Sequence, residues 1–66
     1  MSIAKSIEVT SSSTTSFEDA ISTGVAKVGE TVNGIQSAWV KDSYVTVTNG
    51  AVAEFRVALK VTFLVA

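Results

Sequence analysis

Between residues 17 and 32, apolar side chains recur at every third or fourth position. This spacing places them on one face of a helix, and the stripe consists of Phe17, Ile21, Val25, Val28 and Val32. Ser16 stands directly before the stripe and Asp19 follows three residues later, a variant of the capping box that marks a helix start. Asn33-Gly34 is expected to end the helix, because these residue types tolerate a left-handed backbone. Gly24 should weaken the helix by up to ~1 kcal/mol relative to Ala.

Residues 35–48 and 51–65 alternate between apolar and polar positions, and Asn49-Gly50 stands between them. Two alternating segments joined by Asn-Gly predict a β-hairpin with a two-residue turn. The register that follows from this turn pairs Ala38 with Val61, Trp39 with Lys60, Val40 with Leu59, Ser43 with Arg56 and Tyr44 with Phe55. One face of the hairpin is then apolar and is expected to pack on the helix; in the last strand its members are Ala53, Phe55, Val57, Leu59, Val61, Phe63 and Val65.

A further strand is predicted over residues 3–9, where Ile3, Ile7 and Val9 share one side, and residues 10–16 are expected to form a polar loop. The order is therefore strand, helix, strand, strand. The last strand alternates most regularly, so we place it between the other two. The predicted fold class is α+β, with a three-stranded antiparallel sheet packed on one helix.

The second face of the hairpin differs from a core and from an ordinary solvated surface. It combines one large aromatic ring with cations and hydroxyls: Ser37, Trp39, Lys41 and Ser43 from one strand, and Arg56, Lys60 and Thr62 from the other. This face is the candidate contact or ligand surface.

The chain has 66 residues, 47% of them hydrophobic, and contains no Cys, His or Pro. Zinc sites of Cys and His, disulfides, Cys nucleophiles and His-based triads are therefore excluded, and no motif supports an enzyme. A net charge of −1 without a basic run argues against nucleic-acid binding. No apolar stretch approaches the ~20 residues of a membrane span. The absence of Cys fits a cytoplasmic protein, and the surplus of apolar surface predicts assembly with further copies.

Three segments of the chain resemble the dodecin family. They are the helix start Ser-Phe-Glu-Asp-Ala after a Ser/Thr-rich loop, the segment Glu30-Thr31-Val32, and the last strand Gly-Ala-Val-Ala-Glu-Phe-Arg-Val-Ala-Leu-Lys-Val-Thr-Phe. The resemblance runs from Ile3 to Leu64, and residues 1–66 are interpreted as one dodecin-like domain. It implies a hollow homo-dodecamer that stores and buffers a flavin, riboflavin or FMN, without catalysis.

In the flavin-binding members that this chain resembles, a Trp stacks on the isoalloxazine ring and a Gln binds the flavin edge. The matching positions here are Ser37 and Arg56, while Trp39 lies two residues later on the same face. With Lys60, these residues form the candidate cofactor-binding site. Trp39 has two interpretations, a packing residue between subunits or a displaced stacking platform. Arg56 also has two, an ion pair with Glu54, Asp42 or Glu8 of a neighbouring subunit or a contact to flavin or phosphate. Lys41 and Lys60 are expected to be solvated or stacked on Trp39.

The same two departures resemble a dodecin subgroup that binds calcium and not flavin. The alternative function is therefore a shell that does not bind flavin, either of the calcium type or purely structural. The acidic residues have no EF-hand spacing. A calcium site would have to be assembled from oxygens of several subunits, so its residues are not predicted.

Overall fold

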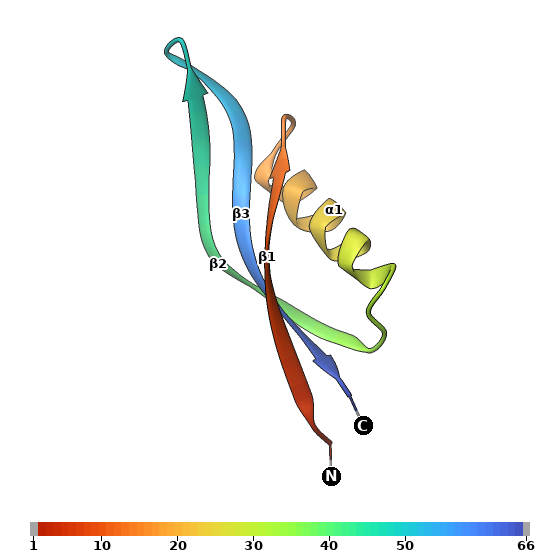
Figure 1. Cartoon of the computed structure of the whole chain (residues 1–66). Coiled ribbons are helices and arrows are strands. Elements are labelled where there is room, and N and C mark those ends of the chain that lie inside the picture. The colour runs from red at the N-terminus through yellow and green to blue at the C-terminus, as the bar shows by residue number, and fades with distance from the viewer. Residues whose placement is uncertain (1, 66) are drawn as a thin grey trace.

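The computed structural model describes residues 2–65 and contains three strands and one helix. They are β1 (Ala4–Ser13), α1 (Phe17–Gly29), β2 (Ile35–Thr48) and β3 (Ala51–Leu64). The sheet order is β1-β3-β2 and both strand pairs are antiparallel, with α1 lying against one face of the sheet (Figure 1). The predicted α+β class, the β-α-β-β order and the central position of the last strand are confirmed.

The start of α1 is fixed by two serines. Ser16 is the N-cap, and its side chain accepts a hydrogen bond of 3.0 Å from the backbone N–H of Asp19. Ser13 Oγ in turn donates to Asp19 Oδ2 at 2.6 Å. The Asp19 carboxylate also lies in the first turn, where the helix dipole favours negative charge. The predicted helix start is therefore confirmed.

Replacing Ser16 with Ala is expected to lower the free energy of unfolding by about 1 kcal/mol, because one backbone donor at the start of α1 loses its acceptor. Ser12→Ala is the matched control, because it makes the same change at an exposed serine of β1, outside the helix cap. The midpoints of chemical unfolding of the two variants give the comparison. Equal midpoints would contradict a stabilising role for this cap.

The helix ends earlier than predicted. The backbone N–H groups of Glu30 and Thr31 bond to the carbonyls of Lys27 and Val28, and α1 closes at Gly29. Val32 therefore lies beyond the helix. Asn33-Gly34 does not end α1 but belongs to the connection to β2, in which Gly34 has a φ of +77°.

Strand β1 is longer than predicted, because residues 10–13 belong to the strand and not to a loop. Ser11 pairs with Val57 and Ser13 pairs with Phe55. The small side chain of Ser11 lies under the helix, where a Cβ added to Gly24 would stand 2.9 Å from Ser11 Cβ. Gly24 therefore allows α1 and β1 to approach closely, a packing role that outweighs its low helix propensity.

The core lies between α1 and the middle of β3. Its fully buried members are Ala20, Val57, Leu59 and Val61. At one end of this core the rings of Phe17 and Phe55 meet edge to face, with their centroids 5.2 Å apart. The predicted packing of the helix stripe on β3 is confirmed for its centre, whereas Ala53 and Val65 are exposed.

The β2–β3 hairpin has the predicted turn, in which Asn49 and Gly50 both have positive φ. Its register departs from the prediction in the middle. Three extra residues interrupt the ladder: Gln36 and Lys41 in β2, and Ala53 in β3. Between the last two, every pair is shifted by one residue, so Tyr44 lies opposite Arg56 and not Phe55, and Ser43 lies opposite Val57 and not Arg56. Because these two bulges are in opposite strands, their shifts cancel, and the predicted pairs of Ala38, Trp39 and Val40 are confirmed.

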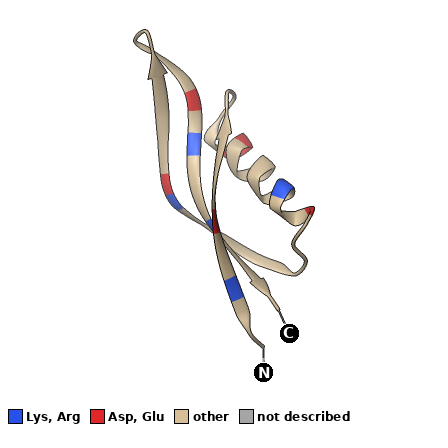
Figure 2. Ribbon diagram, viewed as in Figure 1, with Lys and Arg blue, Asp and Glu red and all other residues tan. Residues whose placement is uncertain are grey.

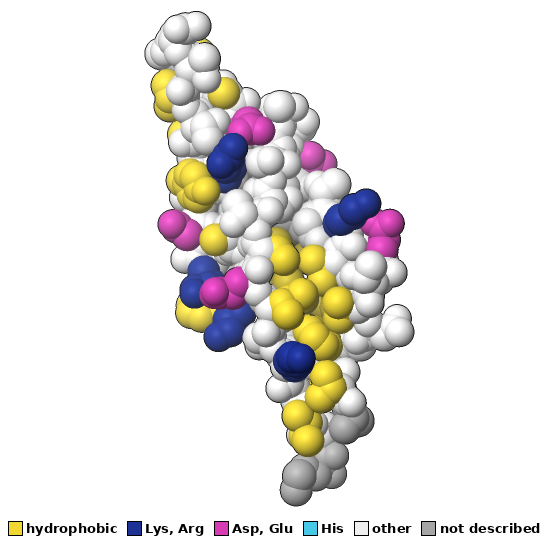
Figure 3. Space-filling view, viewed as in Figure 1, with side chains coloured by type: hydrophobic (Ala, Val, Ile, Leu, Met, Phe, Trp, Pro, Cys, Tyr) yellow, Lys and Arg dark blue, Asp and Glu magenta, His cyan; other side chains and the backbone are white. Residues whose placement is uncertain are grey.

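The molecule is elongated, with extents of 51 × 19 × 14 Å, and the hairpin reaches beyond the helix. The helix therefore covers only part of the apolar surface. Val45, Val47 and Val52 near the hairpin tip are exposed, and so are Ile3 and Val65 at the other end. Figure 3 shows hydrophobic side chains beside the helix and continuing toward the chain ends. Within residues 2–65, no helix has the length and apolar character that a membrane crossing requires.

Candidate functional site

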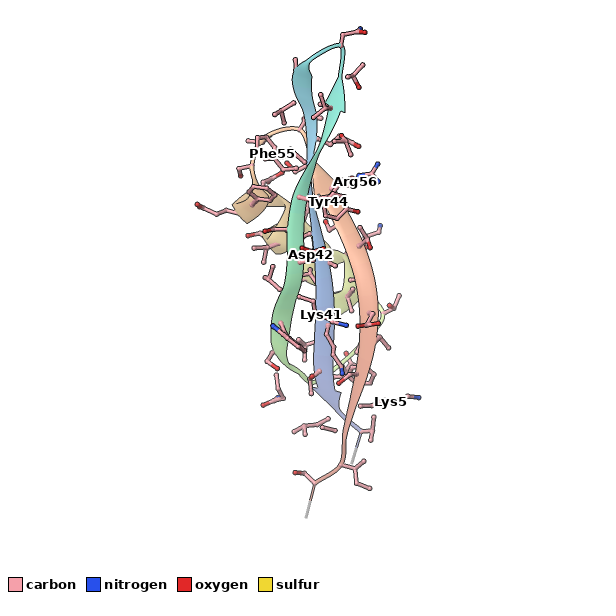
Figure 4. All side chains as sticks on the ribbon, turned by 90° about the vertical axis from the view of Figure 1, so that its left-hand side faces the viewer. Lys5, Lys41, Asp42, Tyr44, Phe55 and Arg56 are labelled. Carbon is pink, nitrogen blue, oxygen red and sulfur yellow. The ribbon has the colours of Figure 1, made fainter. Side chains whose placement is uncertain are left out.

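The sheet face opposite α1, here called the outer face, carries the candidate site. Alternation along the strands and the bulges at Lys41 and Ala53 determine its members: Ser6, Glu8, Thr10 and Ser12 of β1; Ser37, Trp39, Lys41, Asp42, Tyr44 and Thr46 of β2; and Glu54, Arg56, Ala58, Lys60 and Thr62 of β3. Figure 4 shows Tyr44 and Arg56 on this side of the sheet, while Phe55 projects to the helix side. Positive and negative residues lie close together along the strands (Figure 2).

Trp39 is the more exposed of the two aromatic residues placed on the outer face, with 61% of its surface exposed against 43% for Tyr44. It lies opposite Lys60 in the ladder, as predicted. The ammonium group of Lys41 stands 5.8 Å from the centroid of the Trp39 ring, within the range of a cation–π contact. The predicted stacking of a lysine on Trp39 is therefore found for Lys41.

Arg56 forms an ion pair within the chain, with Glu54. Its Nη2 donates to Glu54 Oε1 at 2.9 Å, and its Nε donates to the same oxygen at 3.3 Å. These bonds to Glu54, with a smaller contribution from Tyr44, raise the pKa of Arg56 above its usual value. Since the guanidinium is positively charged in any case, the pairing matters because it occupies two of the donors that a ligand would use.

Glu8 and Lys41 connect the two edge strands across the outer face. Lys41 Nζ donates to Glu8 Oε1 at 2.5 Å, although β1 and β2 are separated by β3. The hydrogen bond and the charge of Lys41 lower the pKa of Glu8, and the charge of Lys60 makes a smaller contribution in the same direction. Glu8 is therefore held as a carboxylate, and Lys41 is restrained between it and Trp39.

A hollow of about 490 Å³ lies on this side of the sheet between β1 and β2. Its polar lining is Glu8, Thr10, Lys41 and Asp42, and Ala58 of the central strand contributes a small side chain. Thr10, Ala58 and Asp42 form one row across the sheet. Because Ala58 is small and its neighbours in that row stand on the flanking strands, the sheet is indented here.

The structure brings some of the predicted site residues together and separates others. Ser37 and Trp39 are successive outward positions of β2, paired with Thr62 and Lys60. Arg56 is four residues from Lys60 along β3, a distance of about 13 Å, and Ala58 lies between them. Ser37, Trp39 and Lys60 thus form one group, whereas Arg56 belongs with Glu54 and Tyr44.

Three residues of the outer face were missed as site candidates. Tyr44 was assigned to the apolar face because the bulge at Lys41 has no sequence signal. Glu8 was considered only as a partner from a neighbouring subunit, yet its alternation with Ile7 and Val9 already placed it outward. Asp42 could not be oriented without the same bulge, and it lies in the row of Ala58.

The acidic residues do not gather into a metal centre in this chain. Among residues 2–65, no three Asp or Glu side chains are grouped closely enough to hold an ion. Glu8, Glu30 and Glu54 each pair with a cation of the same chain.

The Dodecin family profile matches residues 3–66. A dodecin variant from Thermus thermophilus is 26% identical with a TM-score of 0.93, and the match covers 100% of this chain and 98% of that one. A calcium dodecin from Mycobacterium tuberculosis, described as calcium-chelating, is 29% identical with a TM-score of 0.83 and coverages of 92% and 87%. A dodecin from Streptomyces davaonensis has the same fold at 18% identity, with a TM-score of 0.92 and coverages of 98% and 96%. The comparison with curated proteins found no match.

Proposed function

Because the chain belongs to the dodecin family, we propose that it is a non-enzymatic protein that binds and stores a flavin, riboflavin or FMN, on the outer face of its sheet. It works as a homo-dodecamer in the cytoplasm, and residues 1–66 form one dodecin-like domain. The observation that carries the flavin proposal is the exposed ring of Trp39 beside Ser37, Lys60 and the hollow.

Trp39 supplies what a flavin requires most, a flat apolar surface for its ring system. Stacking of a planar base on an aromatic side chain is worth about 1–3 kcal/mol. Trp39 takes this role in place of Ser37, which offers a hydroxyl and no ring. The platform is therefore displaced by about 6–7 Å along β2, toward the hollow.

The proposed assembly is supported by the surface that the helix leaves uncovered. Exposed valines at the hairpin tip and exposed apolar residues at the opposite end would both be buried by neighbouring copies. Non-enzymatic binding is supported by the residue types: without His or Cys, the outer face offers Ser, Tyr, Lys and carboxylates, and Glu8 and Glu54 are paired with cations.

The second candidate function is a dodecin shell that does not bind flavin, of the calcium type or purely structural. Its support is the 29% identity to a calcium dodecin, together with Ser37 at the stacking position and Arg56 engaged by Glu54. Calcium would then be held by carboxylates of several subunits.

The test is a riboflavin titration followed by fluorescence quenching. We expect binding at micromolar concentration or tighter, and a loss of about 5- to 150-fold in Trp39→Ala, because the stacking surface disappears. Trp39→Phe is the control and should retain most of the affinity. Size-exclusion chromatography with light scattering must give a dodecamer for each variant, which separates loss of the ligand from loss of the shell.

Two results would contradict the flavin proposal. One is the absence of quenching with an intact shell. The other is a melting temperature that rises with calcium but not with magnesium in a protein that binds no flavin, which would establish the second candidate. A mass near one or two protomers would refute the dodecamer.

A further inference from the structure

Lys41 contacts two side chains of the outer face that come from different strands. It is the extra residue of a β-bulge, and its ammonium group lies between the Trp39 ring and the Glu8 carboxylate. Glu8 and Lys41 both line the hollow. The pair therefore stands where a molecule stacked on Trp39 would extend its next group into the hollow.

The Glu8–Lys41 pair is open to exchange. The two side chains are 59% and 40% exposed, and exposed ion pairs of this kind contribute little to stability because water and salt screen them. A phosphate group carries about −1.5 to −2 charges near neutral pH and three acceptor oxygens, so it attracts an ammonium more strongly than one carboxylate does. The ammonium has three donors and can contact Trp39 and an anion together.

We propose that Lys41 recognises an anionic group on the ligand, and that Glu8 competes with that group for Lys41. The site thereby prefers a planar ring that bears a phosphate over the same ring without one, and Glu8 limits this preference. The choice of a planar ring rests on the proposed function; the exchange at Lys41 rests on the ion pair itself. Two other charged groups face the pair: Lys60 attracts both carboxylate and phosphate, and Asp42 repels both.

The first experiment tests the exchange without a flavin. Trp39 is the single Trp of the chain, so its fluorescence reports on the group beside it. Inorganic pyrophosphate is titrated into the assembled protein and into Glu8→Gln, which should bind it roughly two- to fivefold more tightly. Lys41→Gln should lose the response. Glu30→Gln is the matched control, because it breaks the exposed pair with Lys27 on α1 and should behave as the unaltered protein.

The second experiment compares FMN with riboflavin. The affinity for FMN divided by that for riboflavin should rise by the same two- to fivefold or so in Glu8→Gln and fall toward one in Lys41→Gln. The affinity for riboflavin itself should change little in both variants. An equal change for both flavins in Glu8→Gln would overturn the inference. So would equal pyrophosphate binding in Glu8→Gln and Glu30→Gln, or no response of Trp39 in any variant. If neither flavin binds, the proposed function fails, and the pyrophosphate titration still decides the role of Lys41.

Discussion

Replacing Leu59 with Ala is expected to lower the free energy of unfolding by about 2–5 kcal/mol. Leu59 is the largest fully buried side chain, with 1% of its surface exposed, and it lies between Val9 and Val40 under the helix. Within residues 2–65 the fully buried core has four members, so few side chains are available to refill the cavity left by Ala. For a chain of this length the total stability is roughly 3–10 kcal/mol, and the loss is a large share of it.

Leu64→Ala is the matched control for Leu59→Ala, because it makes the same change in the same strand at a residue that is 39% exposed. Both variants are unfolded in guanidinium at one protomer concentration, since assembly makes stability dependent on concentration. If Leu59→Ala loses no more stability than Leu64→Ala, the core assigned between α1 and β3 is incorrect.

Gly24→Ala is expected to destabilise the protein by about 1–3 kcal/mol, although Ala is the better helix former. The added Cβ would stand 2.9 Å from Ser11 Cβ and 3.2 Å from Leu59 Cδ1, so the helix must move away from β1. The midpoint of chemical unfolding measures the loss of stability, at the same protomer concentration as for Leu59→Ala.

Two further variants separate this contact from helix propensity. Gly29→Ala makes the same change in the last residue of α1, where the new Cβ would meet only Ile35 Cδ1 at 3.9 Å, and stability should be unchanged or higher. Ser11→Gly combined with Gly24→Ala removes the opposing Cβ, so the double variant should lose less than the sum of the single losses. A stabilised Gly24→Ala would show that the close approach is unimportant.

The hairpin shows which part of the register can be predicted from sequence. Asn49-Gly50 identifies the turn, and the pairs of Ala38, Trp39 and Val40 follow from it by counting. The bulges at Lys41 and Ala53 were not predicted, because an extra residue in a strand has no composition signal when its neighbours keep alternating. The prediction was therefore correct at Trp39 and wrong at Tyr44.

The predicted ends of β1 and α1 were wrong for a related reason. Four consecutive polar residues in positions 10–13 are typical of a loop, yet the small serine at position 11 is what lets Gly24 of the helix come close. Tertiary packing overrides local preference there. At the end of α1, Asn33-Gly34 predicts a cap, although the carbonyls of Lys27 and Val28 already accept hydrogen bonds from the backbone N–H groups of residues 30–32.

The site was predicted only as far as it depends on strand alternation. Trp39, Lys60 and Ser37 lie on one face because they are near the unshifted parts of the ladder. The partners of Arg56 and Lys41 depend on side-chain geometry across three strands, which alternation does not determine. Glu54 and Glu8 were therefore considered only as residues of a neighbouring subunit.

The two compensating bulges of the hairpin have a consequence for how such a surface evolves. The segment between them, residues 42–46 of β2 and 54–58 of β3, is offset by one residue from both flanks. A one-residue slip of this pairing would remove both bulges, keep the turn and the pairs beyond the segment, and turn residues 42–46 of β2 to the opposite face of the sheet. Changes that favour one pairing register, and not only substitutions at the ligand contacts, are therefore a route by which relatives acquire different outer-face residues on one scaffold.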